Sequence, residues 1–171
     1  RPASMSMLTI ASNCNVLQQY GSMQFTNYAE PSSKIDENDF SFVFLLTFQG
    51  YHYFTGGDVG GGPPYEDLET PISAYLNTYP ITGFHCCSYK ASHHGSANST
   101  NATFLTCIQP QLTVIPSALR SFNGTQLPGQ STVEALLGAS STLFFTYIYD
   151  TSPYSGSISY YNDVLLQITD P

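Results

Sequence analysis

The 171-residue sequence has few charged side chains, and above all few positive ones. Asp, Glu, Lys and Arg make up 9% of the chain, against about 25% in an ordinary soluble protein. Four Lys and Arg against twelve Asp and Glu leave a net charge of −8. This balance argues against nucleic acid as a partner, because affinity for nucleic acid comes largely from clustered Lys and Arg.

Long apolar runs and paired cysteine motifs are also missing. No run of about 18 apolar residues occurs, so the sequence predicts no membrane span. Cys14, Cys86, Cys87 and Cys107 contain no C-x-x-C pair and do not indicate a zinc site.

In an oxidising compartment the four cysteines could form two disulfides, with three possible connectivities. A bond between adjacent Cys86 and Cys87 would be strained, so we favour Cys14 and Cys107 each pairing with one of them. Buried free thiols are the alternative.

Three glycosylation sequons, at Asn98, Asn101 and Asn123, favour a secreted, extracellular glycoprotein. The low lysine content and the abundance of Ser, Thr, Asn and Tyr favour the same localisation. Asn98 and Asn101 are close enough in sequence for steric crowding to leave one of them without a glycan. The chain begins at Arg1 and has no signal-peptide core, which predicts a mature or processed product.

Apolar periodicity and turn residues predict one β-rich α/β domain over residues 1–171. The run at 40–48 is nearly all apolar, which predicts a strand buried on both faces. A hairpin partner is expected at 51–55, and a helix at 66–77 with Pro71 as an interruption. The other expected elements are strands at 7–10, 15–19, 23–27, 84–92, 112–115, 143–149, 157–161 and 164–168, and helices at 101–108 and 131–137.

Asp58 and the pair His93-His94 each follow a predicted strand and together look like half of a metal site. Strand ends hold ligands rigidly, and carboxylate oxygen and imidazole nitrogen suit Zn²⁺ or Mn²⁺. The remaining histidines, His52 and His85, complete no H-x-H pair. In the metal-free alternative, Asp58 caps a glycine-rich turn and the two histidines form a hydrogen-bonded pair that stabilises the loop. His52 is expected on the surface of its hairpin strand.

Four motifs in register resemble one branch of the metallo-β-lactamase superfamily. They are D-F-S-F-V-F-L-L at 39–46, F-T-G-G-D at 54–58, Y-K-A-S-H-H-G-S at 89–96, and F-L with I-Q-P at 104–110. This branch includes the hydrolase domain of bacterial DNA-uptake (competence) channel proteins and related secreted phosphodiesterases. The order and spacing agree over residues 38–117, and 146–159 also look like the family's last hairpin.

The resemblance implies an αββα sandwich with a metal centre between its two sheets, of which this chain is the C-terminal half. In that family Asp58 and His93 would be metal ligands, and His94 a proton donor or phosphate contact. Zinc or manganese is implied, and two such ions could activate a water and clamp a phosphodiester.

The sequence departs from the family pattern at several points. The signature H-x-H-x-D-H, expected in an N-terminal half, is absent from the 171 residues. Gly57 adds a residue to the usual T-G-D turn, and the late G-H-P motif is replaced at 127–130 by a segment without histidine. Asp58 and His93 supply two ligands, whereas a catalytic metal normally has at least three protein ligands. Glycans at Asn98 and Asn101 would crowd the site and disfavour a large substrate.

Two interpretations fit these departures. In the first, the chain is part of a processed metal-dependent phosphoesterase, and a second polypeptide supplies the missing ligands. In the second, the fold is a metal-free, catalytically decayed extracellular glycoprotein that serves a structural or self-assembling role. Half a sandwich leaves an apolar sheet face uncovered, so we expect the chain to pack against another polypeptide or against copies of itself. A third hypothesis is a binding module whose Tyr-rich faces hold glycans.

Overall fold

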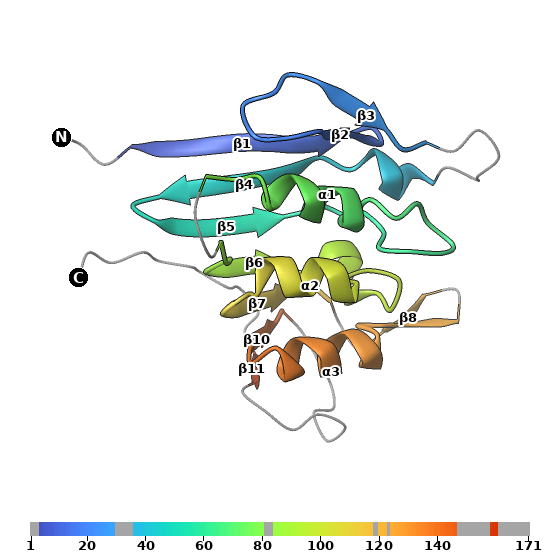
Figure 1. Ribbon diagram of the computed structural model, residues 1–171. Coiled ribbons are helices and arrows are strands. Elements are labelled where there is room, and N and C mark those ends of the chain that lie inside the picture. Colours follow the sequence, from blue (N-terminus) through green and yellow to red (C-terminus); the bar gives the residue numbers. More distant parts are fainter. Residues whose placement is uncertain are drawn as a thin grey trace.

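The structure, a computed structural model, describes residues 4–29, 36–80, 84–117, 120–122, 124–146 and 158–160. It contains a nine-stranded mixed sheet and three α-helices (Figure 1). The sheet strands are β1 (Met5–Ser12), β2 (Asn15–Leu17), β3 (Phe25–Asn27), β4 (Val43–Phe48), β5 (Tyr51–Thr55), β6 (Ser88–Lys90), β7 (Leu112–Ile115), β10 (Thr142–Phe145) and β11 (Ile158–Tyr160). The helices are α1 (Glu69–Leu76), α2 (Ala102–Ile108) and α3 (Gln130–Gly138). The predicted β-rich α/β class is confirmed.

The sheet has an antiparallel half and a parallel half. Its strand order is β11-β10-β7-β6-β5-β4-β1-β2-β3. Strands β3, β2, β1, β4 and β5 pair antiparallel in that order, and β5, β6, β7, β10 and β11 pair parallel. A separate hairpin consists of β8 (Arg120–Phe122) and β9 (Thr125–Leu127). The three α-helices lie on the same face of the sheet (Figure 1).

The hydrophobic core fills the space between the sheet and these helices. Phe54, Tyr89 and Phe104 lie at its centre with no exposed surface. Their ring centroids are 5.2 to 6.1 Å apart, within the range of favourable aromatic pairs. Further buried side chains come from both layers: Val43, Leu45, Ile115, Leu143 and Phe145 from the sheet, and Ile72, Leu76, Ile108, Val133 and Leu136 from the helices.

The opposite face of the sheet is apolar, and the described part of the chain covers it only partly. Strand β4 alternates, with Val43 and Leu45 buried and Phe44 and Leu46 half-buried. The prediction that 40–48 is buried on both faces is therefore wrong, because the helices cover one face only. Met7 pairs with Leu46 on the uncovered face and is 62% exposed.

Several predicted elements have different bounds. Residues 37–40 form a 3-10 helix, η1 (Glu37–Phe40), capped by Asp36, so β4 begins later than expected. Helix α1 begins at Glu69, which places Pro71 in its first turn. Proline has no backbone N–H, but the N–H groups of the first turn have no partner within the helix, so no hydrogen bond is lost. The expected strand at 84–92 is confined to β6, whereas β7, α2 and α3 match their predictions closely. The strand predicted at 164–168 and the segment 147–157 lie outside the described residues.

His52 is buried, which corrects its predicted surface position. It pairs with Thr47 across the β4–β5 hairpin, on the helix-covered face. Only 5% of it is exposed, its ring centroid lies 5.4 Å from that of Phe84, and its Nδ1 lies 3.2 Å from Thr47 Oγ1. Burial lowers the pKa of His52 below its ordinary value of 6.5.

Replacing Phe54 tests the position of the core. Phe54→Ala should lower the free energy of unfolding by about 3–5 kcal/mol, because it opens a cavity between three aromatic rings. Met23→Ala, at a side chain that is 85% exposed, should change it by less than about 0.5 kcal/mol. Urea unfolding followed by circular dichroism measures both, and equal effects would contradict this core.

Candidate functional site

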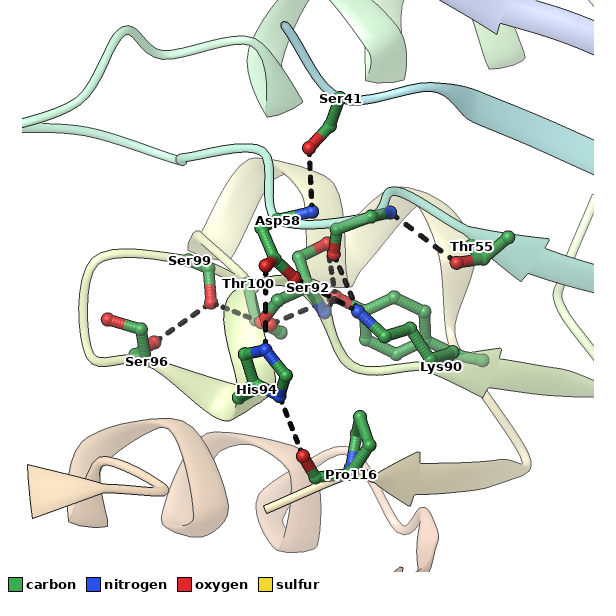
Figure 2. A network of polar contacts seen from close by, with 12 residues as sticks. Ser41, Thr55, Asp58, Lys90, Ser92, His94, Ser96, Ser99, Thr100 and Pro116 are labelled. Atoms are coloured by element: carbon green, nitrogen blue, oxygen red, sulfur yellow. Dashed lines mark hydrogen bonds and ion pairs between the residues drawn. The ribbon is translucent and has the colours of Figure 1, made fainter. Parts of the chain in front are cut away.

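The candidate site lies beyond the carboxyl ends of the parallel strands β5, β6 and β7. Open α/β sheets bind ligands at this edge, because the loops that follow neighbouring strands converge there. Asp58 follows β5, Lys90 ends β6, and Pro116 follows β7. Figure 2 shows Asp58, Lys90 and His94 directed toward one another at this edge.

The Asp58 carboxylate lies between two basic side chains. Lys90 Nζ is 3.3 Å from Oδ1, and His94 Nε2 is 3.4 Å from Oδ2. The backbone N–H of Asp58 donates to Ser41 Oγ at 2.9 Å. The hydrogen bond from His94, reinforced by the charge of Lys90, holds the pKa of Asp58 well below its usual range although partial burial opposes this. Asp58 is therefore ionised at neutral pH.

The surroundings of His94 favour its protonated form. Its Nδ1 lies 2.7 Å from the carbonyl oxygen of Pro116, which can only accept, so Nδ1 carries a proton. Its Nε2 faces the Asp58 carboxylate and donates to it only when it is protonated as well. The hydrogen bond to Asp58 raises the pKa of His94 above 6.5, although partial burial opposes this. The site therefore places an imidazole and an amino group, both basic, around one carboxylate.

His93 faces a different environment from His94. Its ring makes an edge contact with Tyr65, with 4.8 Å between ring centroids. Burial lowers its pKa, so the imidazole is neutral. Its Nδ1 is buried and has no hydrogen-bond partner in the described part of the chain. A neutral imidazole nitrogen without a partner is suited to a metal ion, because buried polar atoms are otherwise nearly always paired.

The two histidines lie in a strained turn, η2 (Ser92–Gly95). His93 has φ 45° and ψ 47°, and His94 has φ 54° and ψ 27°. Adjacent non-glycine residues in the left-handed region are costly and concentrate at functional sites. The inserted Gly57 stabilises this turn, because its carbonyl oxygen accepts from the His93 backbone N–H at 3.1 Å and from Lys90 Nζ at 2.7 Å.

The described residues alone do not fit a metal centre. They contain no group of three or more His, Cys, Asp or Glu side chains that could hold a metal ion. Of the predicted ligands, Asp58 pairs with Lys90 and His94, and no hydrogen bond or ion pair joins it to His93 among the residues described. A complete centre would need further ligands from outside these residues.

Two ionisable side chains, the basic Lys90 and the acidic Glu69, were not predicted from the sequence. Lys90 pairs with Asp58, and its position three residues before His93 within the motif was the available signal. Glu69, at the start of α1, is fully buried. Its carboxylate accepts from the backbone N–H groups of Thr100 and Asn101, both at 2.7 Å. Burial raises the pKa of Glu69 to about 7, against the lowering effect of these hydrogen bonds.

All four cysteines are thiols in the structure. Cys14 Sγ lies 3.4 Å from the carbonyl oxygen of Asp39, and Cys107 Sγ lies 3.7 Å from that of Ser73. Burial raises the pKa of Cys107 to about 11 and that of Cys86 well above its ordinary value, so neither is a reactive thiolate. The pairing of Cys14 and Cys107 with Cys86 or Cys87 stays a prediction.

The sequons at Asn98 and Asn101 differ in how their amides are used. Asn101 caps α2 by accepting from the Phe104 N–H at 2.8 Å. Its Nδ2 donates to the Gly61 carbonyl oxygen at 3.2 Å and to Asp67 Oδ1 at 3.1 Å. Among the described residues no hydrogen bond involves the side chain of Asn98, which borders a pocket of about 260 Å³. Asn123 lies outside the described residues.

Comparison of the chain with models of known protein families and with curated proteins finds no match to either. None of the described helices has the length and apolar character needed to cross a membrane.

Titration of the histidines tests the ion-pair arrangement. By NMR the pKa of His94 should lie above 6.5 and that of His93 below it. Asp58→Asn should move the pKa of His94 down toward 6.5 and leave that of His52 low. The stabilisation from His94 is fully present below its unfolded pKa and is lost as the pH rises through the raised folded pKa. Identical titration of His93 and His94 near 6.5 would contradict the arrangement.

Expression through a eukaryotic secretory pathway tests the two neighbouring sequons. Asn98→Gln should remove a glycan, because the Asn98 amide is free to be modified. Asn101→Gln should leave the glycan mass unchanged and lower the free energy of unfolding by about 0.5–2 kcal/mol through loss of the helix cap. Intact mass before and after glycosidase treatment gives the occupancy, and the opposite pattern would show that Asn101 is the modified residue.

Proposed function

We propose that this chain forms the C-terminal half of a secreted, metallo-β-lactamase-like hydrolase domain that cleaves phosphate esters. A second polypeptide would supply the H-x-H-x-D-H half and the remaining metal ligands. The observation that carries the proposal is the pairing of Asp58 with His94 beyond the carboxyl ends of β5 and β6, next in sequence to His93, whose Nδ1 has no partner among the described residues.

The charges at this edge suit a phosphate ester. A protonated His94 could donate a proton or a hydrogen bond to a phosphate oxygen, and Asp58 would keep it protonated and oriented. Lys90 adds a second positive charge within the same group. Zinc or manganese is the metal class that suits Asp58 and His93 as partial ligands.

The sheet face opposite the helices, which the described residues cover only partly, supports a second polypeptide. Phe44, Leu46 and Tyr53 are only half-buried there, and Met5 and Met7 are 67% and 62% exposed. A contiguous apolar face of this kind marks an interaction surface in soluble proteins. A second sheet packed on this face would complete the sandwich that the sequence resemblance implies; copies of the same chain are the other occupant.

The alternative function is a metal-free extracellular structural or self-assembling glycoprotein. It is favoured by the pairing of both Asp58 oxygens with Lys90 and His94, which satisfies the carboxylate without a metal. The low charge of the chain would also offer little resistance to association between sheet edges.

Metal analysis of the purified native protein separates the two functions. Intact-mass analysis should reveal a second chain with H-x-H-x-D-H, and elemental mass spectrometry should find zinc or manganese. Asp58→Asn and His93→Ala should lower the metal content and the hydrolysis of bis(4-nitrophenyl) phosphate, while the exposed control Glu134→Gln should change neither.

Absence of both a second chain and a metal would overturn the hydrolase and favour the structural role. Sedimentation or light scattering of the chain would then test self-association, and a stable monomer of this chain alone would contradict both functions.

A further inference from the structure

The segment that carries the two histidines contains three strained residues. His93, His94 and Thr100 all have positive φ, of 45°, 54° and 60°. A non-glycine residue in this region is energetically unfavourable and persists only where the surrounding structure fixes it. The contacts that fix the segment from Ser92 to Asn101 therefore determine where the histidines lie.

The far end of the segment is fixed by the buried carboxylate of Glu69. Glu69 Oε1 accepts from the N–H of Thr100, and Oε2 accepts from the N–H of Asn101, both at 2.7 Å. Both oxygens thus hold consecutive backbone groups, one of them in the strained Thr100. When Glu69 is ionised, its hydrogen bonds to these N–H groups are of the stronger, charge-assisted kind, and the use of both oxygens fixes orientation as well as distance.

Two side-chain hydroxyls connect this end of the segment to the histidine turn. Tyr89 Oη accepts from the Ser92 N–H at 2.8 Å and lies 3.1 Å from Thr100 Oγ1. Ser99 Oγ lies 2.9 Å from the carbonyl oxygens of both Ser92 and Ser96. Thr100 and Ser92, the residue before His93, are therefore joined through the same hydroxyl group (Figure 2).

We propose that Glu69 is a positioning residue for the candidate site, and that its carboxylate keeps His93 and His94 in their left-handed conformations through the segment from Ser92 to Asn101. Glu69 acts at a distance, because no hydrogen bond or ion pair joins it to Asp58, His93 or His94 in the residues that are described. The inference rests on the proposed function only because it treats these histidines as functional. The contacts between Glu69 and the segment do not depend on that function.

The surroundings of Glu69 require a carboxylate of this length. A Cβ atom at Gly61 would collide with Glu69 Oε2, so glycine at that position admits the side chain. Gln at position 69 would direct an amide N–H group at one of two backbone N–H donors and lose that hydrogen bond. Asp is one methylene shorter and cannot reach both donors from the same backbone position.

The experiment compares Glu69→Gln with the exposed control Glu134→Gln in the purified protein, without metal or substrate. Hydrogen exchange should accelerate at the Thr100 and Asn101 amides by roughly ten- to a hundredfold, as expected when a hydrogen bond to a charged group is lost. NMR backbone couplings and chemical shifts of His93 and His94 should leave the left-handed range in Glu69→Gln. Both should be unchanged in Glu134→Gln.

Faster exchange at Thr100 and Asn101 with unchanged left-handed signals from both histidines would overturn the proposal, because Glu69 would then stabilise only its own surroundings. Should Glu69→Gln not fold, Glu69→Asp retains the charge and is judged by the same two readouts. Absence of metal or of a second chain overturns the hydrolase alone, since neither readout depends on them.

Discussion

The register between β5 and β6 is the constraint on which the rest of the structure depends. It sets Phe54 opposite Tyr89 and Thr55 opposite Lys90. Because side chains alternate across a sheet, the first pair enters the core under the helices and Lys90 emerges on the other face, where it meets Asp58. A slip of one residue would bury the lysine and expose the tyrosine, so core packing and site assembly depend on the same pairing.

Two carboxylates hold the histidine segment from opposite ends, and they do so in different ways. Asp58, Lys90 and His94 have side chains that are 33%, 21% and 44% exposed, so their ion pairs contribute little to stability and chiefly fix orientation. Glu69 is fully buried and binds backbone amides, where removal of a partner is far more costly. The accessible carboxylate thus orients a side chain, whereas the buried one fixes the main chain.

Elements with strong local signals could be predicted from the sequence. Asn101 begins α2 with a side-chain cap, and the short apolar run of β7 has the predicted bounds. Predictions that depended on tertiary contacts were less accurate. The burial of His52 follows from the register of its hairpin, and that of Glu69 from the space left by Gly61. The proximity of Asp58 and His94 was expected because each follows a strand. The ion pair between Lys90 and Asp58 could not be predicted without knowing on which face of the sheet Lys90 lies.

The fit between Glu69 and Gly61 also bears on how relatives of this chain can be recognised. A side chain at position 61 would collide first with the Glu69 carboxylate, and it would also crowd the Cβ of Asn101. Selection should therefore act on these two distant positions together, and lineages that keep the acid should keep the glycine. Such paired substitution would be visible in divergent sequences even where the motifs around the histidines have faded.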